Sequence, residues 1–204
     1  MNAPDGGTPL DVSGLPSYRH GHHSLMWWGT MGLIAIEAMA FALAIGAYFY
    51  LRSQAESWPL SVPPPELFWG TLNLAILLVS IVPNHWTKQV AEEGDERKMR
   101  IGLVVCVLIG VAMIAVRAME FTTLHCRWDT NAYGSIVWLL LGLHTVHLVT
   151  DVYDTGVLMA LFFTTRIEGR RHVDVAENGM YWYFVVYAWI PIYLVIYWVP
   201  RMPA

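Results

Sequence analysis

Long apolar runs alternate with short polar segments along the 204 residues of this chain. About 20 helical residues are needed to cross roughly 30 Å of hydrocarbon. Five runs reach or approach this length: residues 26–51, 67–82, 101–119, 135–163 and 180–199. The second run is short, but its helix can continue past Pro83 to Trp86. The pattern predicts an all-α fold, a polytopic membrane bundle of five transmembrane helices.

The segments between these runs carry residues that interrupt helices or belong in water. Residues 56–65 contain Trp58-Pro59 and three consecutive prolines, which cannot continue a helix. Residues 91–100 and 166–178 are densely charged, and residues 127–131 form a short polar turn. The chain therefore divides into a polar amino-terminal segment, residues 1–25, and one five-helix transmembrane domain, residues 26–200. No internal repeat is visible, so an inverted-repeat transporter fold is not indicated.

The basic residues are distributed unevenly between the two ends of the predicted bundle. Eight lie on the amino-terminal side and three on the opposite side, with Arg117 inside or near a span. The two sets are Arg19, Lys88, Arg97, Lys98, Arg100, Arg166, Arg170 and Arg171, against Arg52, Arg127 and Arg201. Because cytoplasmic loops are enriched in Lys and Arg, we expect a cytoplasmic amino terminus and a carboxyl terminus outside.

The composition fits a membrane protein and excludes several other classes. Hydrophobic residues make up 56% of the chain and charged residues 14%, whereas soluble domains carry about 25% charge. The net charge of −4, without a basic stripe, argues against nucleic-acid binding. The surroundings of Cys106 and Cys126 indicate neither a disulfide nor a metal site. The first 24 residues lack the features of a signal peptide, so we expect the first span to be retained.

Two glutamates lie in or beside the predicted spans. Glu37 is about 16 Å into the first span at helical rise, near the midplane, where an intramembrane carboxyl costs about 3 kcal/mol or more. It is either a proton-relay or lipid-contact site, or the source of an interhelical hydrogen bond that fixes packing. Glu120 follows the third span near the interface, where a structural salt bridge with Arg117, three residues earlier, is expected.

Four polar residues in the fourth span share one helix face. His144, His147, Asp151 and Asp154 follow the spacing i, i+3, i+7 and i+10. Imidazoles and a carboxylate can ligate a transition metal, but one helix rarely completes a site, and no other span offers matching ligands. We therefore predict no metal site and no catalytic centre. The alternative is a polar face turned inward against Arg117, Glu37 or neighbouring tyrosines.

Several segments, in order, resemble the third subunit of haem–copper oxidases, the cytochrome c oxidase subunit III family. Their order and spacing extend over residues 26–199, and the length is similar to the five-helix bacterial form. The segments include Ile36-Glu37-Ala38-Met39-Ala40-Phe41, Met119-Glu120-Phe121, Gly142-Leu143-His144-Thr145-Val146-His147 and Tyr181-Trp182-Tyr183-Phe184.

The resemblance implies a bundle without a cofactor of its own. It would lie in the bacterial inner membrane beside subunits I and II, which would hold the haem and copper. The family binds phospholipid, supports proton uptake and protects the oxidase from inactivation during turnover. Glu37 would match the buried carboxyl of the family and Glu120 its second glutamate. His144 and His147 would match its paired histidines.

The chain departs from the family pattern at several positions. Where members usually have Trp-His-Phe-Val-Asp in the last span, this chain has Trp182-Tyr183-Phe184-Val185-Val186. Arg117 replaces an expected glutamine, and Asp151 replaces an expected glycine. Since either charge alone is expensive in lipid, we predict an interhelical ion pair between Arg117 and Asp151.

These departures leave three functional alternatives beside the oxidase subunit. One is the related accessory protein of nitric oxide reductases, another a stand-alone transporter with Glu37 lining its path, and the third a pure scaffold. The sequence does not distinguish cytochrome c from quinol as the electron donor. Replacing Glu37 by Gln would alter proton uptake in an oxidase, transport in a transporter, and only stability in a scaffold.

Overall fold

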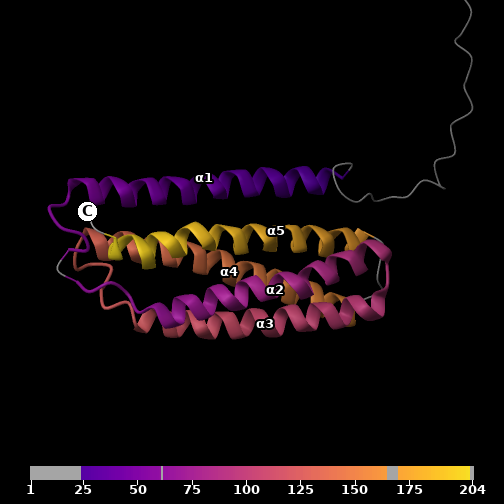
Figure 1. Cartoon of the computed structure of the whole chain (residues 1–204). Coiled ribbons are helices and arrows are strands. Elements are labelled where there is room, and N and C mark those ends of the chain that lie inside the picture. The colour runs from indigo at the N-terminus through magenta and orange to yellow at the C-terminus, as the bar shows by residue number, and fades with distance from the viewer. Residues whose placement is uncertain (1–23, 61, 165–169, 203–204) are drawn as a thin grey trace, which may run out of the picture.

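The fold is shown in Figure 1 as a computed structural model, which describes residues 24–60, 62–164 and 170–202. Five long helices in these ranges are apolar enough to cross a membrane, which confirms the predicted fold class. They are α1 (Leu25–Gln54), α2 (Leu67–Glu93), α3 (Glu96–Thr122), α4 (Ala132–Thr164) and α5 (Arg170–Tyr193). α5 continues as the π-helix η2 (Leu194–Trp198) and the 3-10 helix η3 (Val199–Arg201). The predicted polar segment, residues 1–25, falls almost entirely outside the described residues, as do Arg19 and Arg166.

The helices extend beyond the apolar runs that predicted them. α2 passes through Pro83 and ends at Glu93, and it is followed by Gly94, whose φ of 77° is left-handed and therefore suits glycine. Asp95 then accepts a hydrogen bond from the backbone N–H of Lys98, 3.2 Å away, and caps the start of α3. The charged residues 91–100 thus form two helix ends and a tight turn rather than a loop.

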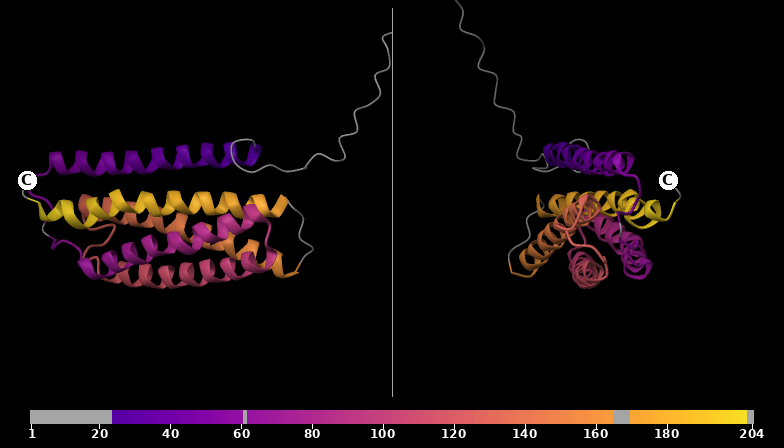
Figure 2. Two further views of the ribbon diagram at one scale, coloured as in Figure 1. Left: turned by 45° about the vertical axis from the view of Figure 1, so that its right-hand side comes forward. Right: turned by 90° about the vertical axis from the view of Figure 1, so that its left-hand side faces the viewer.

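Four helices form a compact body, and α1 lies along one side of it. Figure 1 and Figure 2 show α2, α3, α4 and α5 packed together, with α1 set apart beside α5. α1 packs on α4 and α5 through its buried residues Phe41, Ala44 and Tyr48. Most of α1 is therefore exposed, and its apolar side chains are available to lipid or to another chain.

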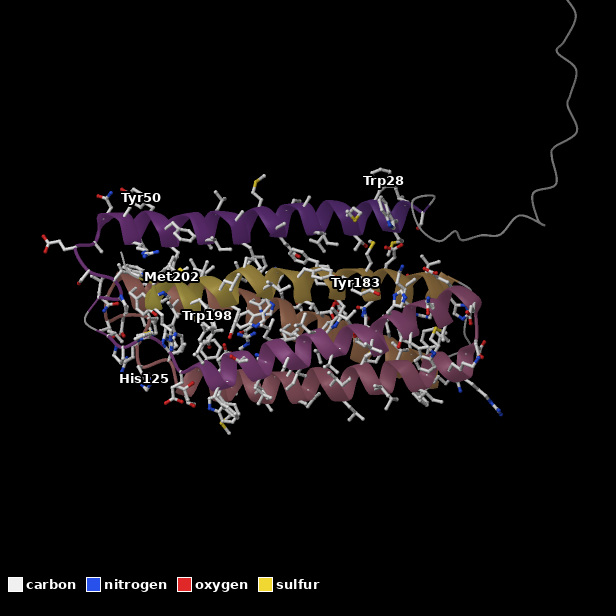
Figure 3. All side chains as sticks on the ribbon, viewed as in Figure 1. Trp28, Tyr50, His125, Tyr183, Trp198 and Met202 are labelled. Carbon is white, nitrogen blue, oxygen red and sulfur yellow. The ribbon has the colours of Figure 1, made fainter. Side chains whose placement is uncertain are left out.

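Aromatic side chains mark both ends of α1. Trp28 and Tyr50 are exposed and point away from the bundle near opposite ends of the helix (Figure 3). Trp and Tyr are favoured at membrane–water interfaces because their rings are amphipathic. Their separation matches a helix that crosses a bilayer from one interface to the other.

Candidate functional site

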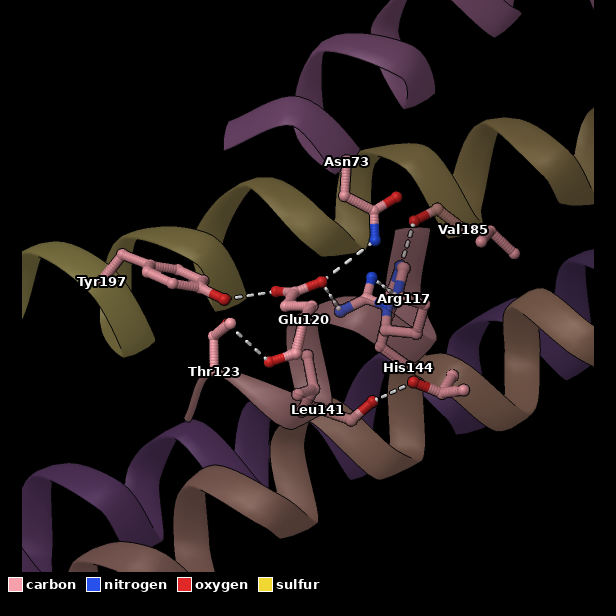
Figure 4. Close-up of polar contacts among 9 residues, drawn as sticks. Asn73, Arg117, Glu120, Thr123, Leu141, His144, Val185 and Tyr197 are labelled. Carbon is pink, nitrogen blue, oxygen red and sulfur yellow. Dashed lines mark hydrogen bonds and ion pairs between the residues drawn. The ribbon is translucent and has the colours of Figure 1, made fainter. Parts of the chain in front are cut away.

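An ion pair lies inside the four-helix body, contributed entirely by α3. Arg117 and Glu120 are three residues apart, and their side chains are 1% and 0% exposed. Arg117 Nη1 is 3.1 Å from Glu120 Oε2, so the predicted salt bridge forms (Figure 4). Burying two charges is costly unless they pair and their remaining atoms find hydrogen bonds.

Two residues from other elements complete the surroundings of the Glu120 carboxylate. Asn73 of α2 donates to Oε2 from Nδ2, 3.1 Å away, and the Tyr197 hydroxyl of η2 donates to Oε1. Figure 4 shows both groups converging on Glu120. Gly70, one turn before Asn73, allows this arrangement, because a Cβ there would meet the Tyr197 ring. Both carboxylate oxygens of Glu120 therefore have partners.

The guanidinium of Arg117 connects α3 to α4 and α5. Its Nη2 donates to Nδ1 of His144, 3.1 Å away, and its carbon lies 3.9 Å from the centre of the Trp189 ring. His144 Nε2 in turn donates to the carbonyl of Val185, at 2.9 Å. With one ring nitrogen accepting and the other donating, this imidazole is neutral. We call the following set the Arg117–Glu120 cluster: Asn73, Arg117, Glu120, His144, Trp189 and Tyr197.

Glu37 occupies a second site, between α1, α4 and α5. The Tyr181 hydroxyl donates to Glu37 Oε2 at 2.6 Å, and His147 Nε2 lies 3.6 Å from Glu37 Oε1. His147 Nδ1 donates to the carbonyl of Leu143 at 2.6 Å, which leaves Nε2 turned toward Glu37. The Glu37 side chain is 22% exposed, so it remains accessible from one side.

The structure does not form the predicted ion pair between Arg117 and Asp151. Arg117 reaches Glu120 on its own helix and His144 on α4, whereas Asp151 lies seven residues, or about 10 Å, further along α4. Asp151 is 2% exposed, and its carboxylate oxygens accept no hydrogen bond from the residues that the structure describes. The four-residue face of α4 is thus divided between different neighbours rather than gathered at one site.

A cavity of about 590 Å³ lies between α1, α4 and α5. It extends from the end of the bundle where α1 begins, at Met26 and Arg171, to Glu37 and Tyr181. At helical rise this depth is roughly 16 Å. Five carboxyl side chains line it: Glu37, Asp151, Asp154, Asp174 and Glu177. Within the described ranges, no three His, Cys, Asp or Glu residues are grouped so that they could hold a metal ion.

Several residues contribute to these sites although the sequence pattern did not predict it. Asn73, Trp189 and Tyr197 complete the Arg117–Glu120 cluster, and Tyr181 completes the Glu37 site. Of these residues, Tyr181 falls in one of the segments named above as resembling the family. However, only the packing of α2 and α5 against α3 and α1 shows which carboxyl each one contacts.

These features define a class of protein: a polytopic helical membrane protein with hydrogen-bonded polar clusters between its helices. Residues 21–200 match the family described as cytochrome c oxidase subunit III. The chain belongs to this family, as its resemblance predicted.

Three relatives named cytochrome c oxidase subunit 3 illustrate the similarity. The protein of the cyanobacterium Synechocystis sp. is 24% identical over 196 residues, which cover 92% of this chain and 83% of the relative. The Drosophila yakuba protein is 27% identical over 180 residues, covering 84% and 68%. The Pongo abelii protein is 26% identical over 191 residues, covering 87% and 73%. The similarity therefore extends over most of the chain.

Proposed function

We propose that this chain stabilises the catalytic subunit of a respiratory haem–copper oxidase, binds phospholipid and supports proton uptake. Its family makes it an accessory subunit of such an oxidase. The proposed role in proton uptake rests on the position of Glu37, a carboxyl deep in the bundle that is reached by an open cavity.

The partners that we propose are subunit I, with its haem and copper, and subunit II. Electrons from cytochrome c or quinol would pass through these partners, where oxygen is reduced to water and protons are pumped. The exposed apolar surface of α1 offers an area for phospholipid or for subunit I.

We propose the bacterial inner membrane as the location, with the amino terminus cytoplasmic. Basic residues in the described parts of the chain support this orientation. Lys88, Arg97, Lys98, Arg100 and Arg171 lie at the end where α1 begins, and Arg52, Arg127 and Arg201 lie at the other end.

The two polar sites would have different roles. In the Glu37 site, a proton can reside on Glu37 Oε1 or on His147 Nε2, which lie 3.6 Å apart, while Tyr181 holds the other oxygen. In the Arg117–Glu120 cluster, side chains from four helical segments hold α2, α3, α4 and α5 together. Exchange of protons would therefore belong to Glu37 and His147, and fixed packing to Glu120 and His144.

Purification of the tagged native complex in mild detergent tests this function. Mass spectrometry, reduced-minus-oxidised visible spectra and oxygen consumption should together reveal a haem-bearing, copper-binding partner that consumes oxygen. Removal of this chain from the complex should shorten the catalytic lifetime without removing haem. A solitary chain, or a partner that reduces nitric oxide and lacks copper, would contradict the proposal.

A further inference from the structure

Asp151 is a buried carboxyl whose partner is missing among the described side chains. It is 2% exposed, and neither carboxylate oxygen accepts a hydrogen bond from the residues that the structure describes. A carboxyl without a partner is unfavourable in an apolar interior unless it is protonated or bound to water. We therefore expect Asp151 to be protonated or to bind water.

Asp151 contributes to the walls of two cavities. One is the large cavity between α1, α4 and α5. The other is a small cavity of about 10 Å³, lined by Ser80, Asn84, Cys106 and Trp182 as well as Asp151. A polar cavity of this size holds about one water molecule. Asp151 thus lies beside both cavities, with its carboxylate oxygens buried in the wall between them.

The wall of the large cavity carries an excess of acidic groups. Among the residues that the structure describes, five with carboxyl side chains line it and one with a guanidinium, Arg171. A cleft lined by charges of one sign raises the local concentration of the opposite ion, here protons and other cations. A lipid chain in this space would remove water from the acidic side chains of the wall, such as Asp154. The polar wall therefore favours water over lipid as the content of the cavity.

We propose that the cavity between α1, α4 and α5 is a water-filled inlet, which brings protons from the inner face of the membrane to Asp151 and Glu37. A hydronium ion in the inlet gives its proton to a carboxylate and leaves a water molecule behind. This inference rests on the proposed orientation and role in proton uptake. The titratable groups that line the two cavities together with Asp151 are Glu37 on α1, Cys106 on α3, Asp154 on α4, and Arg171, Asp174, Glu177 and Tyr181 on α5.

Cysteine labelling in inverted membrane vesicles tests whether the inlet contains water. Val157→Cys places a thiol in the wall of the cavity, and Val149→Cys is the matched control on the same helix. The two valines are 40% and 42% exposed, but Val149 does not line the cavity. The probes are two methanethiosulfonates of fixed charge, one with a trimethylammonium group and one with a sulfonate group.

We expect the thiol of Val157→Cys to react with the cationic reagent about tenfold faster than the thiol of Val149→Cys does. The thiol of Val157→Cys should also react faster with the cationic reagent than with the anionic one. Adding Asp154→Asn and Asp174→Asn should lower the ratio of the cationic to the anionic rate. The unsubstituted chain gives the background from Cys106 and Cys126. Burial raises the pKa of the Cys126 thiol, which limits its reaction.

Equal labelling rates with the cationic reagent in Val157→Cys and Val149→Cys would overturn the proposed inlet. So would no reaction at Val157→Cys together with bound lipid in native mass spectrometry, which would make the cavity a lipid groove. Thr30→Cys, in the α1 wall, repeats the test if the first variant does not fold. Because labelling needs no oxidase activity, its failure would leave the accessory function standing. Conversely, a failed co-purification of the oxidase would overturn that function and the role of the inlet in proton uptake, but not the presence of water that the labelling reports.

Discussion

Two glutamates lie deep in this bundle and each accepts a hydrogen bond from a tyrosine, but they differ in burial, in their charged or ionisable neighbour and in access to a cavity. Glu120 is 0% exposed, contacts a guanidinium on its own helix and accepts hydrogen bonds at both oxygens. Glu37 is 22% exposed, faces an imidazole instead of a guanidinium, and opens onto an acidic cavity. Burial alone therefore does not define a proton site. A carboxyl with its charge compensated stabilises packing, whereas one that faces water can exchange protons.

The largest effect is expected from removing the cation of the compensated site. Arg117→Gln leaves the Glu120 charge buried without its partner, which costs about 3–5 kcal/mol. We expect most of the chain to be lost from the purified complex, with a lower thermal midpoint for what remains. Quantitative mass spectrometry of the subunits measures this loss.

Arg100→Gln is the matched control for Arg117→Gln. Arg100 lies on the same helix, 3.9 Å from Glu96, in a partly exposed pair worth less than about 1 kcal/mol. The double variant Arg117→Met/Glu120→Gln should recover much of the lost stability, because it removes both charges together. An Arg117→Gln variant as mild as Arg100→Gln would contradict the structural role of the cluster.

A smaller loss is expected from crowding the cluster. Gly70→Ala places a methyl group against the Tyr197 ring and moves its hydroxyl from Glu120, which costs about 1–3 kcal/mol of unfolding free energy. Gly46→Ala is the control, since nothing lies within 4 Å of the added methyl group. Denaturation of the chain in detergent measures both. Equal effects of the two substitutions would show that contact with Tyr197 does not matter.

Matched tyrosine variants compare the two carboxyls directly. Tyr197→Phe removes a hydrogen bond from a carboxylate that water does not reach, at a cost of about 1–3 kcal/mol. Tyr181→Phe removes one from Glu37, where water from the cavity can replace the hydroxyl, at a cost of less than about 1 kcal/mol. Thermal unfolding of the purified complex gives both values. A larger loss of stability in Tyr181→Phe than in Tyr197→Phe would mean that Glu37 is more enclosed than Glu120.

The smallest effect on stability is expected at Asp95, a carboxylate outside the membrane spans. It serves as a reference for a carboxylate in water. Hydrogen bonds from the Lys98 side chain and backbone lower the pKa of Asp95. The stabilisation from Asp95 is therefore present above about pH 4, the ordinary value of an aspartate, and is lost as the pH falls through the lowered pKa. Asp95→Asn retains the helix cap but not the charge, so we expect a slight lowering of the thermal midpoint at pH 7. This difference should disappear in acid, and one that persists there would contradict the charge effect.

The helices were predictable from the sequence, but the partners of the polar residues were only partly so. Five apolar runs predict five spans because hydrocarbon thickness fixes helix length. The contact of Arg117 with Glu120 was predictable because residues three apart share a helix face. Asp151 was misassigned to Arg117, since its surroundings depend on how α1 lies beside α4 and α5. The inlet was not foreseen for the same reason.

The contrast between Glu37 and Glu120 is tested most directly by the same substitution at both positions in the purified oxidase. Stopped-flow measurement of proton uptake, with subunit content from mass spectrometry, separates exchange from assembly. Glu37→Gln should leave the subunit content unchanged and slow proton uptake several-fold. Glu120→Gln should reduce the subunit content while the complexes that retain the chain take up protons at the normal rate. Normal proton uptake in Glu37→Gln, or slowed uptake in fully assembled Glu120→Gln, would contradict the account.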